Sequence, residues 1–154
     1  MDEQYVRLKA DVLDEMAAIE QTIDDLRRLT GAMDRERIDN QTKAALGTFL
    51  MNFYVGVENI LKRIGREYYR QMPQGDSWHR EILNLACCPP DGKIPVFEKS
   101  IIDRLNPYRG FRHVFVSGYG FKLRIELMAS LLDNIDLLWQ DIKKALDSFW
   151  GKIN

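Results

Sequence analysis

The chain has 154 residues, which is the size of one ordinary domain, and we expect residues 1–154 to fold as a single unit. Hydrophobic residues make up 45% of the chain and its formal net charge is -1. A core is therefore expected, and no global field would attract nucleic acid or a membrane, so a nucleic-acid site would have to be a local basic patch. The two cysteines, Cys87 and Cys88, are neighbours, and a disulfide between neighbours is strained, so we expect two reduced thiols.

The N-terminal residues argue for a cytoplasmic protein. Asp2, Glu3, Arg7 and Lys9 bring charges into this segment, and it has no apolar stretch of the kind found in signal peptides. Along the chain, no apolar run approaches the roughly 18 residues that a membrane helix needs. We therefore expect a cytoplasmic location and no contact with a membrane.

The first predicted element is a long amphipathic helix from about Glu3 to Leu29. Apolar residues recur along it at steps of three and four, while charged residues fill the other face. Thr30-Gly31 is expected to end this helix, because glycine commonly follows the last helical turn.

A second and longer helix is expected from about Arg37 to Tyr69, again with a wide apolar face. Three glycines, Gly47, Gly56 and Gly65, lie inside it at nine-residue steps. Each glycine costs about 1 kcal/mol relative to alanine in a helix interior. We expect them to allow close packing of a neighbouring helix.

Shorter elements follow. Pro73 and Gly75 interrupt the chain, and Asp76 or Ser77 can cap a short helix that runs to Cys87. After the loop of residues 89–92, the pattern predicts a short helix over residues 95–105. Asn106-Pro107 then resembles an N-cap followed by proline at the first helical position, which predicts a separate short helix that ends before Gly118.

The last predicted helix runs from Phe121 to Trp150, carries one apolar stripe and is ended by Gly151. Three long amphipathic helices with short ones between them, and no alternating pattern typical of strands, predict an all-α antiparallel helical bundle.

The segment between Arg104 and Ile125 is a candidate binding site because it is locally basic. It contains no aspartate or glutamate, although acids slightly outnumber bases in the whole chain, and aromatic residues are interleaved with its cations. Arginines neutralise phosphates and aromatic faces stack on exposed bases, so the pattern is typical of RNA binding. Its basic residues are Arg104, Arg109, Arg112, His113, Lys122 and Arg124.

A simpler interpretation of this segment stays open. Phe111 and Phe115 are four residues apart and are expected to face the core of a helix, which would leave the arginines as an ordinary solvated surface. On the same helix, Arg109, His113 and Ser117 step by four and share one face.

Other kinds of site are not indicated. The two histidines, His79 and His113, have no cysteines or paired acids at metal-ligand spacing, so neither a metal nor another cofactor is expected. Capping or packing is the favoured role of His79, and Glu58 forms no convincing carboxylate pair with Asp24-Asp25. The sequence has no phosphate-binding glycine loop and no nucleophile elbow.

Residues 108–121, which read YRGFRHVFVSGYGF, resemble the signature helix of HepT-like proteins in the HEPN superfamily. Residues 52–62 resemble the second helix of that family, and residues 77–83 resemble a block that follows it. The matches come in the family's order and span roughly residues 45 to 150.

This resemblance implies a HEPN-like all-α bundle, usually a homodimer with its site between the protomers. It further implies a metal-independent endoribonuclease that acts as a toxin on RNA. The implied partner is a small nucleotidyltransferase antitoxin, which can silence the toxin by transferring AMP to the motif tyrosine, Tyr119.

The family motif is an arginine, four to six residues, a histidine, one residue and a tyrosine. Its arginine maps to Arg112 and its tyrosine to Tyr119, whereas the histidine position holds Ser117. RNA cleavage without a metal needs a base for the 2′-hydroxyl proton, and a serine hydroxyl cannot act as one without a partner. Arginine still suits the phosphate, because its planar fork binds two oxygens.

His113 is a weak substitute for the motif histidine. It lies one turn before Ser117 and about 6 Å away along the helix axis, whereas catalytic geometry rarely tolerates errors of 1 Å. Orienting Arg112, binding phosphate or a structural role is the favoured interpretation of His113. The expected site thus comprises Arg112, His113, Ser117 and Tyr119, with Arg104, Arg109, Lys122 and Arg124 contacting RNA.

Three hypotheses follow. The first is an active or weakened HepT-like ribonuclease. The second is a degenerate member of the family that dimerises and binds its antitoxin or RNA without cleaving. The third is a helical scaffold whose basic segment is only surface.

Overall fold

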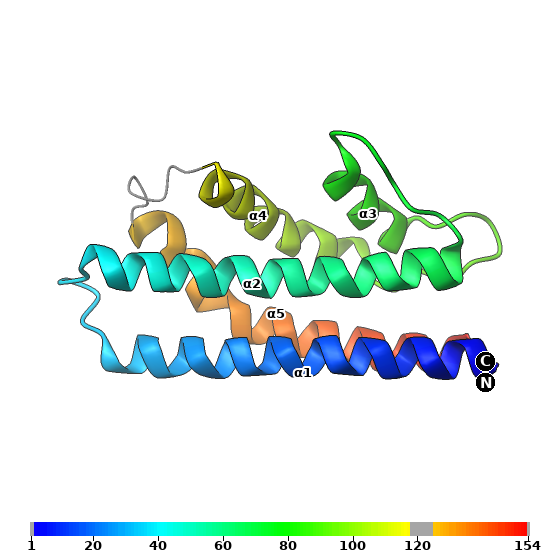
Figure 1. Cartoon of the computed structure of the whole chain (residues 1–154), viewed down its shortest axis with the longest axis horizontal. Coiled ribbons are helices and arrows are strands. Elements are labelled where there is room, and N and C mark those ends of the chain that lie inside the picture. Colours follow the sequence, from blue (N-terminus) through cyan, green and yellow to red (C-terminus); the bar gives the residue numbers. More distant parts are fainter. Residues whose placement is uncertain (1, 118–124, 154) are drawn as a thin grey trace.

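The structure is a computed structural model in which residues 2–117 and 125–153 are described (Figure 1). Helices α1 (Glu3–Ala32) and α2 (Asn40–Ile64) are the first two elements, and a π-helical turn, η1 (Gly65–Tyr69), continues α2. Helices α3 (Trp78–Cys87), α4 (Lys99–Val116) and α5 (Ile125–Lys152) follow. The described ranges contain no strand, which confirms the predicted all-α fold.

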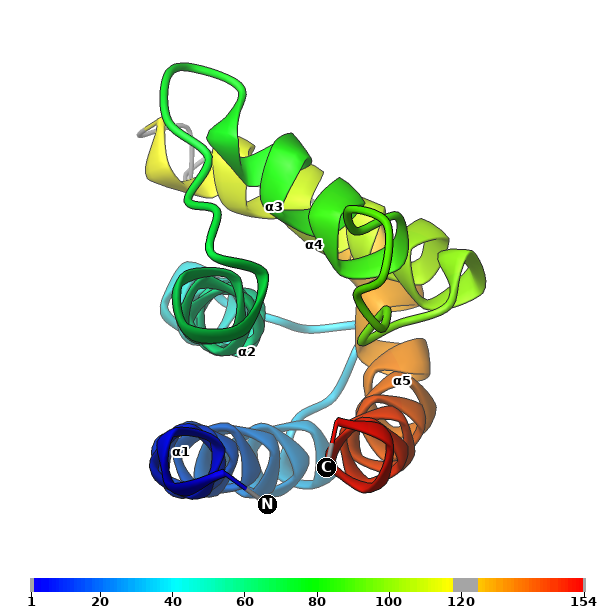
Figure 2. The same cartoon turned by 90° about the vertical axis from the view of Figure 1, so that its right-hand side faces the viewer.

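Helix α2 is the central element. It runs antiparallel to α1 and also packs against α3, α4 and α5. In the end-on view of Figure 2, α1 and α5 lie on one side of α2, whereas α3 and α4 lie on the other. The core between these helices contains fully buried aromatic side chains, among them Phe53 of α2 and Trp139 of α5, whose rings meet edge to face.

The first two helices differ from the prediction at their ends. α1 continues past Thr30-Gly31 to Ala32. α2 begins at Asn40 rather than Arg37, because the Asp39 carboxylate caps it by accepting a hydrogen bond from the Thr42 backbone N–H at 2.7 Å.

Two of the predicted close-packing glycines behave as expected. A Cβ placed on Gly56 would lie only 2.6 Å from Cγ1 of Ile19, so α1 and α2 approach closely at this point. A Cβ on Gly65 would lie 3.0 Å from the backbone oxygen of Gln71, where the chain leaves η1.

The predicted helix boundary at Asn106-Pro107 is wrong, because α4 continues through it. Buried side chains follow each other on one face of α4 from Ile101 through Leu105 and Tyr108 to Phe111, so packing favours a continuous helix. Pro107 has no backbone N–H, so the carbonyl of Asp103 lacks its helical hydrogen bond. Both Pro107 and Asp103 are exposed. Water can solvate that carbonyl, which reduces the cost of the interruption.

The last helix ends later than predicted. Gly151 is still helical and α5 reaches Lys152. Its predicted start at Phe121 lies outside the described residues, which resume with α5 at Ile125.

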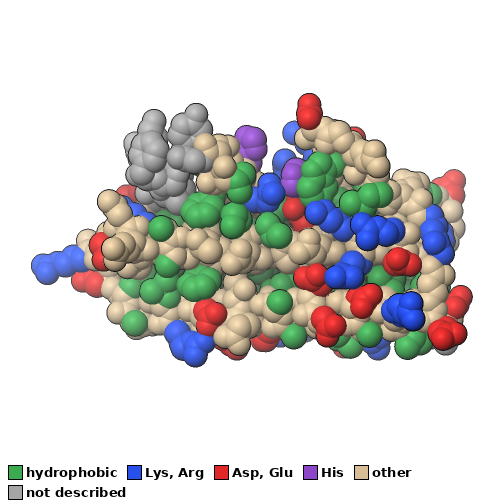
Figure 3. Space-filling view, in the orientation of Figure 1, with side chains coloured by type: hydrophobic (Ala, Val, Ile, Leu, Met, Phe, Trp, Pro, Cys, Tyr) green, Lys and Arg blue, Asp and Glu red, His purple; other side chains and the backbone are tan. Residues whose placement is uncertain are grey.

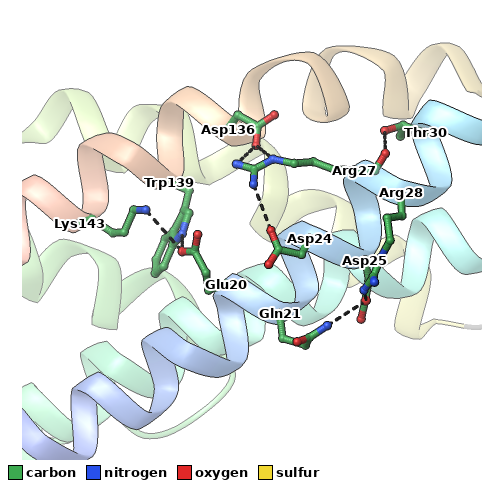
Figure 4. A network of polar contacts seen from close by, with 10 residues as sticks. All are labelled: Glu20, Gln21, Asp24, Asp25, Arg27, Arg28, Thr30, Asp136, Trp139 and Lys143. Atoms are coloured by element: carbon green, nitrogen blue, oxygen red, sulfur yellow. Dashed lines mark hydrogen bonds and ion pairs between the residues drawn. The ribbon is translucent and has the colours of Figure 1, made fainter.

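Polar contacts join α1 to α5 along their exposed edge (Figure 4). The indole Nε1 of Trp139 donates to the Glu20 carboxylate at 2.5 Å, and this hydrogen bond is the main reason that the pKa of Glu20 lies below its usual value. One turn before the end of α1, the Arg27 guanidinium binds the Asp136 carboxylate at 2.8 Å. The hydrogen bond to Glu20 gives the buried Trp139 a partner for its only polar atom.

By length and composition alone, the segment Asn40–Tyr69 is long and apolar enough to cross a membrane, which was not expected from the sequence. More than half of that window is buried against the other helices, as expected for the central helix of a bundle.

Candidate functional site

The residues of the predicted motif lie on the second half of α4, after Pro107. Arg109 is half-buried, and its Nε donates to the side-chain oxygen of Asn106 at 3.3 Å. Arg112 is half-buried as well, and its Nε is fully shielded from solvent without a hydrogen-bond partner among the described residues. A shielded cationic N–H without an acceptor is rare in proteins, which marks this guanidinium as a group that a bound anion would satisfy.

Ser117 and His113 share one face of α4, as the spacing predicted. Ser117 is the C-cap residue that follows the last residue of the helix, and its Oγ donates to the backbone carbonyl of His113 at 2.7 Å. Both side chains are exposed. In the described part of the chain, no carboxylate contacts the His113 ring, so neither residue has a partner that would activate it as a base.

Arg104 lies two turns closer to the start of α4. Its Nη1 is 2.6 Å from an Asp141 carboxylate oxygen of α5. This arginine therefore ties α4 to α5, and its charge is compensated before any RNA approaches. Tyr119, Lys122 and Arg124, which complete the predicted set, lie outside the described residues.

Beneath the motif helix, α2 contributes two buried polar residues one turn apart, Tyr54 and Glu58. Burial raises the pKa of Tyr54 strongly; the negative charge of Glu58 raises it further, and the charges of Arg109 and Arg112 lower it. The tyrosine hydroxyl therefore lies within electrostatic range of the carboxylate and of the two α4 arginines. Among the described residues, this hydroxyl has no hydrogen-bond partner.

His79 of α3 completes this arrangement. Its Nδ1 lies 2.6 Å from Oε2 of Glu58, whose side chain is only 2% exposed. The imidazole packs on the neighbouring Trp78 ring with 3.6 Å between centroids, and Nζ of Lys62 lies 4.2 Å from the centre of that indole. We call these residues the buried polar cluster: Tyr54, Glu58, His79, Arg109 and Arg112.

The space-filling view shows where the cluster reaches the surface. Histidine side chains are visible over α3 and over the end of α4, and the surface is notched between the two helices (Figure 3). Cationic side chains and a carboxylate lie in this notch. The helices that carry the predicted motif and His79 thus border the same depression.

Glu58 and His79 were not predicted from the sequence to belong to a site. The two residues are 21 positions apart, and only the packing of α3 on α2 brings them together. One signal was present: Glu58 is a lone acid in a helix stretch whose neighbours Val57 and Ile60 are buried core residues. A buried carboxylate needs a cation or several donors, so its position alone indicates a polar partner.

Thiol and metal chemistry find little support in the described residues. Cys87 and Cys88 are both free, with 3.3 Å between their sulfur atoms, and burial raises the pKa of the Cys87 thiol to about 11. A thiol with this pKa remains protonated at neutral pH and is a poor nucleophile. In residues 2–117 and 125–153, no three side chains of the His, Cys, Asp or Glu type gather as a metal site.

Comparison with known proteins identifies the family of the chain. None of the curated proteins or solved structures compared with the chain matches it. A family described as HepT-like protein matches residues 45–153, which begin inside α2 and include every residue of the buried polar cluster. That match covers most of the chain, which therefore belongs to the HepT-like family.

Proposed function

We propose that this protein is the toxin of a toxin–antitoxin pair and cleaves RNA as a metal-independent endoribonuclease. Its membership of the HepT-like family supports a HEPN-type role. The observation that carries the proposal is Arg112, whose Nε is shielded from solvent without a partner among the described residues and whose charge, like that of Arg109, acts on the buried Tyr54 hydroxyl.

Arg112 would act on the phosphate that is cleaved. A guanidinium offers two parallel N–H groups to two phosphate oxygens, and it stabilises the extra negative charge that develops as the 2′-oxygen attacks phosphorus. Arg109, one turn away, would hold a neighbouring phosphate. Because Arg104 is already paired with Asp141, we give it only a minor part in RNA binding.

Cleavage of bulk tRNA and mRNA by the purified protein in EDTA tests this proposal. Arg112→Ala should reduce the rate about 100-fold or more, the usual effect of removing one donor to a developing anion. Arg66→Ala is the matched control, because it removes the same charge from an exposed position on η1, outside the cluster. Equal losses in both variants, or cleavage that survives Arg112→Ala, would contradict the assignment.

A second candidate function is binding without cleavage, and Ser117 is the observation that favours it. The hydroxyl that replaces the motif histidine already donates to a backbone carbonyl and has no base beside it. If only this histidine is missing, Ser117→His should create cleavage in a protein that is otherwise inactive. If the native protein cleaves, the binding-only candidate is excluded.

We further propose that the protein forms a homodimer and binds a nucleotidyltransferase antitoxin in the cytoplasm. The end of α4 and the start of α5 expose apolar side chains, with Val116 52% and Leu127 63% exposed. Exposed aliphatic residues near a charged site are typical of an interface. Sedimentation of the native protein beside Val116→Lys tests the dimer, since a buried lysine should shift the population towards monomer.

The proposed modification concerns Tyr119, which would receive AMP from the antitoxin. Intact mass after incubation with the cognate nucleotidyltransferase and ATP should rise by one AMP group per chain. Tyr119→Phe should abolish that increase. An unchanged mass, or an addition that persists in Tyr119→Phe, would rule out this tyrosine as the acceptor.

A further inference from the structure

We propose that His79, held by Glu58, is the proton acceptor for RNA cleavage and thus replaces the histidine that α4 lacks. The proposal rests on the ribonuclease function proposed above. His79 belongs to α3, outside the motif segment, and its contact with a buried carboxylate distinguishes it from His113.

The contact between the two residues fixes the chemical state that a base needs. Glu58 is almost fully buried and accepts a hydrogen bond from Nδ1 of His79 at 2.6 Å. With the proton on Nδ1, the lone pair of the neutral ring is on Nε2, which has no hydrogen bond to any described residue. A buried carboxylate behind an imidazole also stabilises the positive charge that appears once the ring takes a proton.

The position of the ring is fixed as well. Trp78 covers one face of the imidazole, and Glu58 holds its edge. The side chain nevertheless remains 24% exposed, whereas that of Glu58 is 2% exposed. His79 is therefore anchored on its inner side and accessible on its outer side, as a group that exchanges protons with a bound substrate must be.

Tyr54 connects this pair to the proposed phosphate site. Its hydroxyl feels the charge of Glu58 and also those of Arg109 and Arg112. Glu58 also contacts His79 directly, so the same carboxylate acts on both the imidazole and the Tyr54 hydroxyl. Since α3 packs against α4 and the notch between them is lined by cations, a phosphate on Arg112 would lie beside His79.

The reaction that follows is balanced without a metal. Nε2 of His79 takes the proton of the ribose 2′-hydroxyl while the 2′-oxygen forms a bond to phosphorus. The bond from phosphorus to the 5′-oxygen breaks, the leaving oxygen takes a proton from water, and a 2′,3′-cyclic phosphate and a free 5′-hydroxyl result. The imidazolium then returns its proton to water. Glu58 touches no reacting atom and is a positioning residue.

Charged groups lie on α3 itself and on the three elements that pack against it, α2, α4 and η1. α2 supplies Glu58 and Lys62, and α4 supplies Arg109 and Arg112. On α3 itself, Arg80 is exposed and Glu81 accepts a hydrogen bond from Ser77. On η1, Arg66 is exposed and Glu67 accepts from Gln4. Of these groups, only Glu58 makes direct contact with the imidazole.

The decisive experiment measures cleavage in EDTA by the native protein, Arg112→Ala, His79→Gln and His113→Gln. His79→Gln should lower kcat at least about 100-fold, the usual contribution of a positioned base. His113→Gln, which makes the same change one helix away, should lose less activity than His79→Gln, and a larger loss in His113→Gln would overturn the proposal. Thermal melting of each variant shows whether the fold is retained, and glutamine can keep the hydrogen bond to Glu58.

A substrate with an activated leaving group separates a base from an acid. Uridine 3′-(4-nitrophenyl phosphate) releases a nitrophenolate that needs no proton, so a variant that lacks only an acid regains its rate. We expect His79→Gln to remain slow with this substrate. A rate close to that of the native protein would overturn the assignment of His79 as the base.

The pH profile tests the positioning role of Glu58. In the native protein, kcat/KM should decrease as the pH is lowered and the base becomes protonated; this decrease is the acid limb of the profile. The acid limb should be absent from the residual activity of His79→Gln. Glu58→Gln removes the charge but not the size of the side chain, so the limb should move to lower pH. A limb that stays in place in Glu58→Gln would mean that Glu58 is only structural.

The outcomes distinguish the two proposals. If neither the native protein nor any variant cleaves RNA, the ribonuclease function fails, and the role of His79 fails with it. If the native protein cleaves with dependence on Arg112 but His79→Gln is fully active, the ribonuclease function stands and His79 is not the base.

Discussion

At the scale of single residues, Gly56 and Gly110 show that the surroundings of a glycine decide whether a methyl group can be added there. A Cβ on Gly56 would lie 2.6 Å from Cγ1 and 2.9 Å from Cδ1 of Ile19, which is itself buried. Nothing lies within 4 Å of a Cβ placed on Gly110, although this glycine is also inside a helix.

We therefore expect opposite effects of alanine at these two positions. Gly56→Ala should lower the free energy of unfolding by about 1–3 kcal/mol, since overpacking forces α1 away from α2. Gly110→Ala should raise it by about 0.5–1 kcal/mol, because alanine restricts the unfolded chain and favours the helix. Urea denaturation of both variants measures the difference. Equal destabilisation would mean that close packing at Gly56 does not matter.

Single residues also show how far the sequence predicts the site. Arg112 could be singled out because the motif is local and its residues are a few positions apart in the sequence. The contact between His79 and Glu58 could not, since it depends on how α3 crosses α2. The partner of this buried acid is a histidine 21 positions further along the chain, so no local pattern links the two residues.

At the scale of elements, α4 is the helix whose sequence and structure disagree. Asn106-Pro107 is a strong local signal for a new helix, yet α4 continues from Lys99 to Val116. Buried residues on both sides of the proline, Leu105 and Tyr108, keep the two halves in one register. The hydroxyl of Tyr108 also donates to the Leu131 carbonyl at 2.6 Å, which fixes the second half against α5.

Replacing this proline should strengthen the helix. Pro107→Ala restores a hydrogen bond to the Asp103 carbonyl, and we expect the free energy of unfolding to rise by on the order of 1–3 kcal/mol. Pro73→Ala is the control, because Pro73 lies between η1 and α3, where no helical hydrogen bond can be gained. Chemical denaturation decides, and a loss of stability in Pro107→Ala would show that the proline is needed to shape α4.

At the scale of the whole molecule, burial keeps tyrosine hydroxyls of the core in the neutral form. Three tyrosines from different helices have hydroxyls in the interior, and burial raises the pKa of each above the ordinary value near 10: Tyr54, Tyr69 and Tyr108. In the unfolded chain these hydroxyls lose their protons above about pH 10, whereas in the folded protein they do not. The folded state is therefore disfavoured as the pH rises through this range.

The direction of this effect gives a prediction for alkaline solution. The stabilising contribution of each tyrosine is fully present below pH 10 and is lost above it, with a slope of up to about 1.4 kcal/mol per pH unit. Tyr108→Phe should remove one such contribution, so its stability should decline less steeply between about pH 10 and 11.5. Urea unfolding at several pH values measures both slopes, and parallel curves would contradict the prediction.

The architecture as a whole was the easiest feature to predict. Three long apolar stripes with a helical period leave few ways to bury them other than a bundle, and the observed α1, α2 and α5 follow those stripes. The ends of the helices were harder, because they depend on single contacts such as the capping of α2 by Asp39. Residues 118–124, which carry the motif tyrosine, lie outside the described structure, so this part of the site stays a prediction.

The close, tilted contact of the Trp78 ring with the His79 ring also allows the fluorescence of the indole to report the protonation of the imidazole. An excited indole passes an electron readily to an imidazolium in contact with it but not to a neutral imidazole, so protonation of His79 should quench the fluorescence of Trp78. The difference in emission between the native protein and His79→Gln isolates this signal from the two tryptophans of the core. If His79 is the base, the emission and the acid limb of RNA cleavage should change at the same pH.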